Sequence, residues 1–174
     1  MDKSYDPRVL ALDIRPRSFG FAVFEGRNRL LDWGVRSFRS GVNAVKHPAS
    51  KKLLVLLDEF DPSAIVVGKP HPGKNRARAP LFATMQRVAA HRNIPIKLIS
   101  RETVGKAFGG VRLNKYQMAR AVEEHLPELA TRLPPKRKLW QSEDYRMSIF
   151  DAAALGVAHF ARCRRRAAPL PGGP

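Results

Sequence analysis

Apolar residues in the first 40 positions form three short runs separated by polar turns. The runs at residues 8–14, 19–25 and 30–38 have the length and apolar content of buried strands. The links between them, residues 15–18 and 26–28, are short and contain turn-forming residues. Because links this short join neighbouring antiparallel strands, the pattern predicts an antiparallel meander.

The spacing of apolar positions becomes helical after residue 50. Leu53, Leu57 and Phe60 predict a helix over residues 51–60. The other expected elements are strands at 64–68 and 94–99, a helix from Pro80, and helices at 103–108, 115–126 with Asn114 as N-cap, and 145–164. Residues 69–79 and 127–143 are expected to be loops. The order predicts an α/β fold, with a five-stranded mixed sheet and helices on its faces.

The expected organisation is one domain followed by a short tail. Residues 1–163 are sufficient for a domain with a substantial core. Residues 164–174 combine arginines with Pro and Gly and predict a disordered basic tail. No apolar run approaches the roughly 20 residues of a membrane span, no apolar signal segment follows the N-terminus, and Cys163 is the single cysteine. We therefore expect a cytoplasmic protein with no disulfide within the chain.

The charge is strongly positive. Thirty-two Lys and Arg residues against fifteen Asp and Glu residues give a formal net charge of +17. One charge run is explained by a solvated face, but an excess of this size over a whole domain attracts polyanions. Counterion release makes nucleic acid the expected partner, and an anionic membrane surface is the weaker alternative.

Two aspartates lie within apolar segments, where an unpaired carboxylate is costly. Asp13 lies near the end of the first strand. Asp144, Ser148 and Asp151 share one face of the last helix if that helix begins by Asp144. Small residues on this helix would let it approach the sheet, so Asp13 and Asp151 are expected to meet. Converging carboxylates suit Mg²⁺ or Mn²⁺ and phosphodiester hydrolysis.

Each of these acids also has a structural explanation. Asp13 would cap the turn after its strand, or pair with Arg15 or Arg17. Asp151 would pair with Arg146 or with a basic loop. For Asp144, an exposed acid in the first helical turn, favoured by the helix dipole, is the preferred interpretation.

Basic residues gather in three segments that are candidates for nucleic-acid binding. They are Arg15 and Arg17 in the first turn, Lys69, Lys74, Arg76 and Arg78 after the fourth strand, and Lys136, Arg137 and Lys138 beside Trp140. The second segment follows a strand end, where α/β sheets place their sites. The indole of Trp140 either stacks on a base or anchors in the core, and the sequence favours neither.

These motifs together resemble the RuvC-like branch of the RNase H-like superfamily, which includes Holliday-junction resolvases and YqgF-type proteins. The resemblance spans roughly residues 8–161. It is carried by Val9-Leu-Ala-Leu-Asp13 with Phe19-Gly-Phe-Ala-Val23, by Ala64-Ile-Val-Val-Gly68-Lys-Pro, by Ile99-Ser-Arg-Glu-Thr-Val-Gly-Lys106 with Asn114-Lys-Tyr-Gln-Met-Ala119, and by Ser148-Ile-Phe-Asp151-Ala-Ala-Ala-Leu. The order and spacing of these segments are more specific than any one of them.

The resemblance implies a metal-dependent, structure-selective endonuclease that acts on branched DNA as a homodimer. Asp13 and Asp151 match metal-binding positions of the family, and Glu102 or Asp144 would complete the site for Mg²⁺ or Mn²⁺. Glu102 lies one or two positions out of register with the acid of YqgF-type proteins, and Glu143 is a further substitute.

Two departures from the family pattern leave alternatives open. The fourth strand has Val66-Val67-Gly68 where resolvases carry a glutamate, and Ser148 stands where the closing helix carries a second acid. Fewer carboxylates hold Mg²⁺ less well. The alternatives are a non-catalytic nucleic-acid-binding protein of the same fold and a YqgF-type nuclease that processes RNA.

Overall fold

The computed structural model describes residues 6–39, 48–70, 76–110 and 112–167. The strands are β1 (Arg8–Ile14), β2 (Ser18–Glu25), β3 (Arg29–Ser37), β4 (Ala64–Gly68) and β5 (Ile96–Ile99). The helices are α1 (Ala49–Phe60), α2 (Ala79–His91), α3 (Arg101–Ala107), α4 (Lys115–His125) and α5 (Met147–Ala167), with short 3₁₀ helices η1 (Arg76–Arg78) and η2 (Pro127–Arg132). None of the helices in these ranges is long and apolar enough to cross a bilayer.

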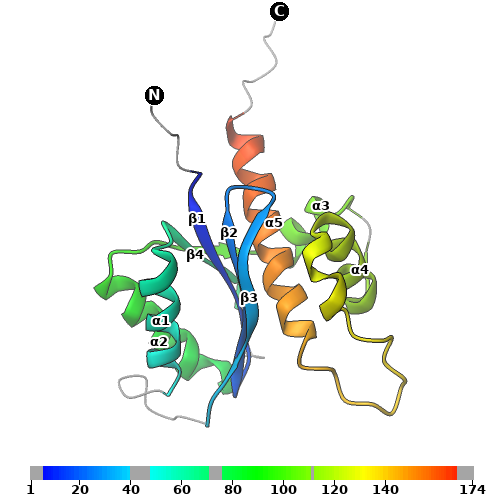
Figure 1. Ribbon diagram of the computed structural model, residues 1–174, viewed down its shortest axis with the longest axis horizontal. Helices are drawn as coiled ribbons and strands as arrows, with labels where there is room; N and C mark the ends of the chain where they lie inside the picture. Colours follow the sequence, from blue (N-terminus) through cyan, green and yellow to red (C-terminus); the bar gives the residue numbers. More distant parts are fainter. Residues whose placement is uncertain (1–5, 40–47, 71–75, 111, 168–174) are drawn as a thin grey trace, which may run out of the picture.

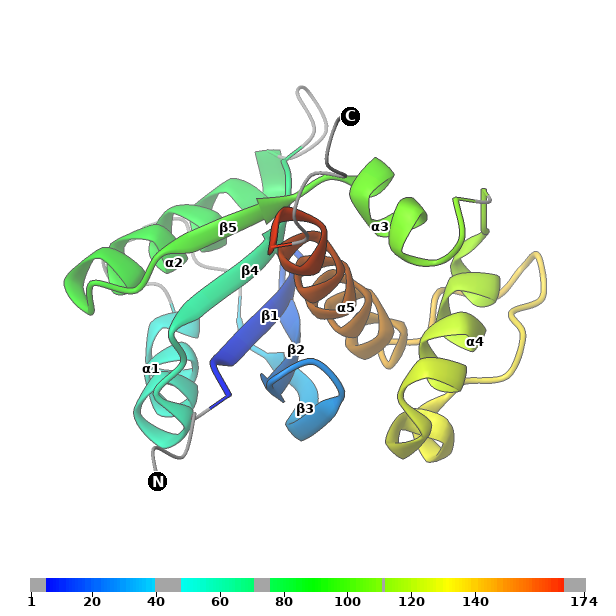
Figure 2. The same ribbon diagram turned by 90° about the horizontal axis from the view of Figure 1, so that it is seen from above.

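The strands form a five-stranded sheet in the order β3-β2-β1-β4-β5. β1, β2 and β3 pair antiparallel in sequence, whereas β4 pairs parallel with β1, and β5 parallel with β4. Helices α1 and α2 cover one face, and α3, α4 and α5 lie on the other (Figure 1 and Figure 2). The predicted mixed sheet, its meander and its helices on both faces are confirmed.

The parallel pairings bring the C-terminal ends of β1, β4 and β5 to the same edge of the sheet. Ligand sites of α/β proteins tend to lie at this edge. The β2–β3 turn lies at the other end of β2, where Gly26 has φ of +65°. Glycine takes this left-handed conformation without the strain that a Cβ atom would cause.

Two hydrophobic clusters pack on opposite faces of the sheet, because successive side chains of a strand point to opposite sides. Leu10 and Leu12 pack with α1 and α2, whereas Val9 and Ala11 pack with α5. Full burial of a large aliphatic side chain contributes roughly 1.5–3 kcal/mol. Asp13 continues the series of Val9 and Ala11, so its position at the end of β1 is on the α5 side.

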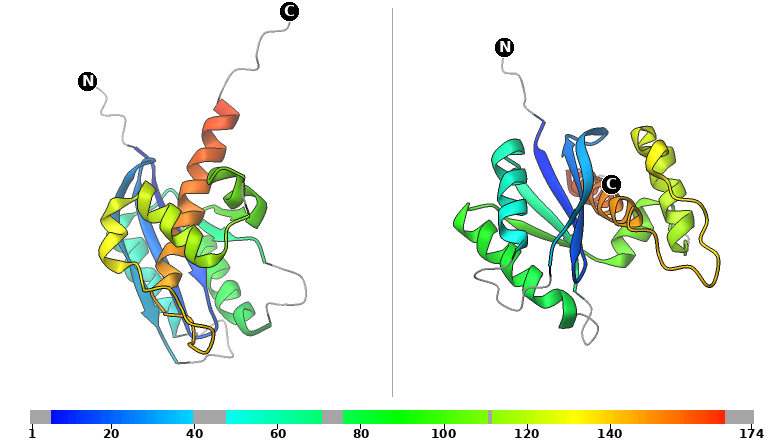
Figure 3. Two further views of the ribbon diagram at one scale, coloured as in Figure 1. Left: turned by 90° about the vertical axis from the view of Figure 1, so that its right-hand side faces the viewer. Right: turned by 60° about the horizontal axis from the view of Figure 1, so that its bottom comes forward.

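Helix α5 packs closely on β1 and β2 because small residues line the contact (Figure 3). Gly20 on β2 lies against Ser148, and Gly156 on α5 lies against the ring of Phe24. A methyl group at either glycine would overlap those atoms. The small residues that the sequence shows along this helix therefore allow α5 to pack closely on the sheet.

Several boundaries differ from the predictions. α3 begins at Arg101 because Ser100 caps it, accepting a hydrogen bond from the Thr103 N–H. Residues 127–132, expected in a loop, form η2. α5 begins at Met147 rather than Tyr145 and continues to Ala167, so part of the segment predicted as a tail is helical. The rest of that segment, residues 168–174, lies outside the described residues.

Candidate functional site

The two aspartates that the sequence brings together lie at the same place in the structure. Asp13 is the next-to-last residue of β1, and Asp151 lies in the second turn of α5. Ser148 Oγ donates a hydrogen bond to Asp13 Oδ2 at 2.8 Å. Asp13 pairs across the hairpin with Gly20, the residue that Ser148 contacts. The close packing of α5 on β2 therefore places the start of the helix against Asp13.

The guanidinium of Arg15 joins both aspartates. Arg15 Nε donates to Asp13 Oδ2 at 2.7 Å, and Nη2 donates to Asp151 Oδ2 at 3.0 Å. The same Nη2 donates to Glu143 Oε1 at 3.2 Å. Arg15 lies two residues after Asp13, in the link to β2, and its side chain is 20% exposed. We call Asp13, Glu143 and Asp151 the acidic cluster.

A second cation reaches the acidic cluster from α4. Lys115 Nζ lies 2.7 Å and 2.9 Å from the two carboxylate oxygens of Glu143, and 3.6 Å from Asp151 Oδ2. Lys115 is the first residue of α4, which begins with the predicted N-cap Asn114 and a capping box formed with Gln117. The helix start therefore fixes where this ammonium group enters the cluster.

The acidic cluster carries more negative charge than these two cations neutralise. Burial, followed by the charge of Asp13, raises the pKa of Asp151 to about 6, although Lys115 and Arg15 act in the opposite direction. Burial also acts to raise the pKa of Glu143, but Lys115 and Arg15 outweigh it and lower that pKa. Burial opposes the charged form of Arg15, yet Asp13 and the other acids raise the pKa of the guanidinium above its usual value.

Two acids predicted to complete the site are engaged elsewhere. Glu102 is on the first turn of α3, its side chain is 75% exposed, and it pairs with Lys106 at 2.5 Å. Asp144 pairs with Arg146 at 2.8 Å and also accepts that residue's backbone N–H. Because α5 begins three residues after Asp144, the expected face shared by Asp144 and Asp151 is wrong. The alternative in which Arg146 pairs with Asp151 is also wrong, because Arg146 pairs with Asp144 and Asp151 pairs with Arg15.

Glu143 supplies the third carboxylate that Glu102 and Asp144 do not. No periodicity in the sequence distinguishes Glu143 from its neighbour, because the choice depends on where the loop enters α5. Lys115 is absent from the sequence-based candidates, since only the packing of α4 beside α5 brings it to the cluster. The alternative that pairs Asp13 with Arg15 is confirmed.

The residues do not fit a divalent ion in this arrangement. Mg²⁺ needs a near-octahedral set of oxygen ligands, but Oδ2 of Asp13 and Oδ2 of Asp151 both accept hydrogen bonds from Arg15. Within the described ranges, no group of three or more His, Cys, Asp or Glu side chains is placed to hold a metal ion. Ser148, at the position of a second family acid, adds a hydroxyl donor rather than a carboxylate.

Exposed basic residues follow the C-terminal ends of β1 and β4. They are Arg17 in the β1–β2 link, Lys69 after β4, and Arg76 and Arg78 in η1. The backbone N–H of Lys69 donates to the carbonyl of Ile99 at 2.8 Å, which ties the segment after β4 to the end of β5. Lys74 lies outside the described residues. A phosphate track along this edge remains a prediction.

The third basic segment is a loop that extends away from the helices and the sheet (Figure 1). Residues 135–142, which we call the projecting loop, are all exposed and lie between buried Pro134 and half-buried Glu143. The loop carries Lys136, Arg137 and Lys138. Trp140 is 79% exposed, so the interpretation of this residue as a core anchor is wrong.

Comparison with known proteins identifies the fold. No family model matches the chain, and no curated protein sequence matches it. The structure of Thermus thermophilus RuvC in complex with a Holliday junction substrate matches with a TM-score of 0.66 at 18% identity, covering 91% of this chain and 96% of that one. The yeast mitochondrial Holliday junction resolvase matches with a TM-score of 0.56 at 14% identity, covering 93% and 87%. Fowlpox virus resolvase with its Holliday junction DNA gives 0.56 at 12% identity, covering 90% and 98%.

The chain therefore has the RuvC-like form of the RNase H-like fold, in agreement with the resemblance seen in its motifs. The strand order places Asp13 at the end of the central strand, beside β2 and β4. The match in fold extends over most of the chain.

Proposed function

We propose, on the premise that this chain has the fold of the Holliday junction resolvases, that it binds branched DNA, four-way junctions above all, without cleaving it. The observation that carries this proposal is the guanidinium of Arg15 between Asp13 and Asp151. Two of the matched structures contain Holliday junctions. The net charge of +17 supports a polyanionic partner.

Arg15 competes with any divalent ion for the carboxylate oxygens. Removing one partner from a buried ion pair costs about 3–5 kcal/mol, because the remaining charge loses its compensation, and a partly buried pair costs less. Here one guanidinium serves three carboxylates, and its side chain is mostly shielded from water. An ion entering this site would have to displace Arg15 from the carboxylates. Its own bonds to the few available oxygens would have to offset the free energy lost with the Arg15 ion pairs.

The same ion pairs make the edge of the sheet suitable for a phosphate backbone. Three unpaired carboxylates beside Arg17 and Lys69 would repel phosphates. Arg15 and Lys115 reduce that repulsion to a single surplus charge when all three acids are ionised. The exposed basic residues can then bind phosphates through counterion release, with no metal between them.

The proposal is tested by comparing affinities for a four-way junction and a linear duplex of equal length, in EDTA and in Mg²⁺. We expect tighter binding to the junction, with the same preference in both buffers. Equal affinity for the two DNAs, or junction binding that disappears in EDTA, would contradict it. A structured RNA of similar length in the same assay tests the choice of DNA over RNA.

A metal-dependent endonuclease acting on branched DNA is the second candidate, favoured by the surplus negative charge of the acidic cluster. Perturbed carboxylates gather at catalytic sites, and the raised pKa of Asp151 marks one such group. Asp13, Glu143 and Asp151 would then hold Mg²⁺ or Mn²⁺ after Arg15 withdrew. A YqgF-type RNA-processing nuclease differs from this candidate in substrate.

Cleavage assays separate the two candidates. A labelled four-way junction and a structured RNA are incubated with the protein in Mg²⁺ or Mn²⁺. Intact substrate agrees with binding alone. Metal-dependent products that are lost in Asp13→Asn would establish the nuclease, and the substrate that is cut would identify its type.

The resemblance also proposes a homodimer, because a four-way junction presents two equivalent faces to a two-fold symmetric protein. Light scattering at several protein concentrations, with and without the junction, measures this directly. A cytoplasmic location is likewise proposed from cysteine usage alone, since the chain has one cysteine. Microscopy of a fluorescent fusion in the source cells checks the location.

A further inference from the structure

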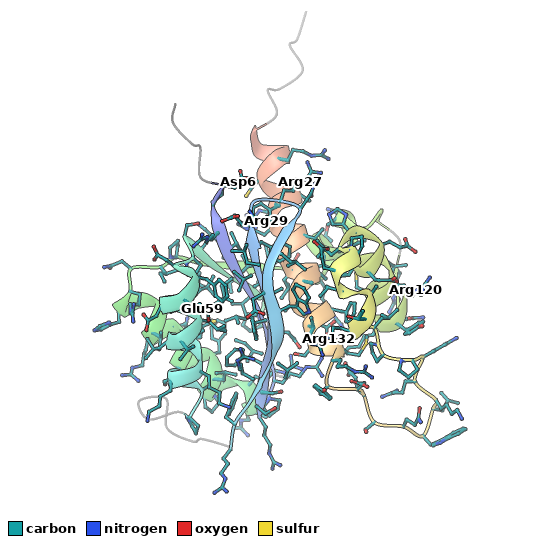
Figure 4. All side chains as sticks on the ribbon, viewed as in Figure 1. Asp6, Arg27, Arg29, Glu59, Arg120 and Arg132 are labelled. Atoms are coloured by element: carbon teal, nitrogen blue, oxygen red, sulfur yellow. The ribbon has the colours of Figure 1, made fainter. Side chains whose placement is uncertain are left out.

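Two large apolar side chains stand in solvent at the end of the projecting loop. Leu139 is 96% exposed and Trp140 is 79% exposed, the highest values among the large hydrophobic residues that the structure describes. Such side chains gain nothing from the folded core, and a partner that covered them would bury their apolar surface. Side chains along this loop project away from the helices (Figure 4).

The end of the projecting loop has a closed backbone turn. The Gln141 N–H donates to the Lys138 carbonyl at 3.1 Å, and the Lys138 N–H donates to Gln141 Oε1 at 3.0 Å. Leu139 and Trp140 are the two central residues of this turn. The ammonium of Lys138 lies 5.6 Å from the centroid of the Trp140 ring. The indole is therefore presented in an ordered setting before any partner arrives.

The projecting loop leads directly into the acidic cluster, because Glu143 follows its last residue. Glu143 binds Arg15 and Lys115, and Pro134, which precedes the loop, is buried. Trp140 therefore lies only three residues from a side chain at the edge where the phosphates are proposed to bind. A nucleic acid lying on that edge would have its neighbouring bases within the reach of the loop.

The chemistry of the loop favours a nucleic acid over another protein. Residues 135–142 include Lys136, Arg137 and Lys138 and no acid. These charges complement phosphates. They would oppose each other if two copies of this chain met through the same loops, because a two-fold interface places identical patches together. The flat face of an indole stacks on any base, with no requirement for sequence.

We propose that the turn of Leu139 and Trp140 inserts at the branch point of the bound nucleic acid, with the indole stacked on a base that lacks a normal neighbour. This inference rests on the proposed binding of branched nucleic acid. In a continuous duplex, both faces of each base are already stacked. A branch point leaves base faces open, so the turn distinguishes branched from linear substrates.

Tryptophan fluorescence tests the contact. The chain has two tryptophans, and Trp33→Phe leaves Trp140 as the single emitter. We expect quenching of this emission by a four-way junction, and little quenching by a duplex with closed ends at the same fraction bound. A junction carrying 2-aminopurine at the branch should lose fluorescence on binding, because the indole stacks on the open face of that base. Equal quenching by both DNAs, or an unchanged 2-aminopurine signal, overturns the inference.

Substitutions provide a second readout. Stacking on a base contributes roughly 1–3 kcal/mol, so Trp140→Ala should weaken junction binding by about 5- to 150-fold and leave duplex binding within about twofold. Trp140→Phe should retain most of the affinity, and Tyr145→Ala, an exposed aromatic outside the turn, should have little effect. Since Trp140 is exposed, these variants should fold normally, which circular dichroism verifies.

The outcomes separate this inference from the proposed function. Wild-type preference for junctions that persists in Trp140→Ala overturns the inference and leaves the proposed function standing. If the wild-type protein shows no preference for junctions, both this inference and the proposed function are overturned. Loss of self-association in Trp140→Ala, seen by light scattering without DNA, would assign the turn to a contact between copies. Binding of wild type but not Trp140→Ala to anionic vesicles, without junction quenching, would assign it to a lipid surface.

Discussion

Gly20 lies directly against Ser148, so only the small side chain of this serine separates strand β2 from helix α5. Ser148 is buried, and its hydroxyl donates to Asp13, the cross-strand partner of Gly20. This contact sets the height of α5 above the sheet and therefore brings Asp151 to the guanidinium that Asp13 already binds. The geometry of the acidic cluster therefore depends on Gly20, a residue that has no functional side chain.

Gly20→Ala should destabilise the protein, because the added methyl group overlaps Ser148 and forces α5 away from the sheet. Overpacking of this kind costs about 1–3 kcal/mol. Urea denaturation followed by circular dichroism measures the change. The matched control is Gly105→Ala in α3, where a Cβ meets nothing within 4 Å and helix propensity improves. An unchanged midpoint for Gly20→Ala would show that α5 adjusts without cost.

Arg15→Gln should destabilise the protein by about 3 kcal/mol in EDTA, because Asp13, Glu143 and Asp151 lose a shared cation. Millimolar Mg²⁺ should restore part of this loss in the variant, since the freed carboxylates can then bind the ion. Wild type should show no such gain. Thermal melts with EDTA or Mg²⁺ measure both effects.

The control for that experiment is Arg27→Gln, which removes a positive charge in the turn between β2 and β3. Arg27 is exposed and lies near the opposite end of the sheet (Figure 4). The melting temperature of the Arg27→Gln variant should differ little from that of wild type and should not respond to Mg²⁺. If Arg15→Gln behaves in the same way as this control, Arg15 does not hold the acidic cluster together.

Lys136→Gln should weaken junction binding and lower the dependence on salt. Each phosphate contact contributes about 0.9 to the slope of log K against log salt concentration on duplex DNA. One lost contact should therefore reduce the slope by about that amount, while the preference for junctions persists. Lys51→Gln on α1, on the other face of the sheet, is the matched change and should leave the slope unaltered. The measurement is anisotropy at several salt concentrations.

His159 should make the protein less stable as the pH falls below 6.5. Burial, followed by the charges of Lys97 and Arg162, lowers the pKa of this histidine from 6.5 in the folded state. The unfolded chain then binds more protons in the interval just below 6.5, so stability falls with pH across that interval. Between pH 7.5 and pH 5.5, wild type should lose more stability than His159→Gln. If urea denaturation gave equal losses in the free energy of unfolding for the two proteins, protonation of His159 would not destabilise the folded state.

The sheet could be predicted from the sequence because its signals are local. Alternating apolar runs, short turns and Pro-bounded helices each act within a few residues, and the structure confirms the meander and the faces covered by helices. Asp13 and Asp151 could also be placed together, since an acid at a strand end and one on a small-residue helix have few ways to be compensated.

The remaining members of the acidic cluster could not be predicted because their positions depend on long-range packing. Glu143 displaces Asp144 as the third acid because α5 begins at Met147, a boundary shift that periodicity does not define. Lys115 arrives from a helix that packs beside α5. The exposure of Trp140 likewise depends on a turn closed by Gln141, which apolar spacing does not reveal.

Titration of the wild-type protein with Mn²⁺, followed by electron paramagnetic resonance of the free ion, measures whether Arg15 keeps the acidic cluster free of metal. Arg15 occupies the oxygens that a metal would need, so we expect no stoichiometric binding at micromolar Mn²⁺, in wild type or in Asp13→Asn. One or two ions bound tightly per chain in wild type, and lost in Asp13→Asn, would contradict this expectation and establish the acidic cluster as a metal site.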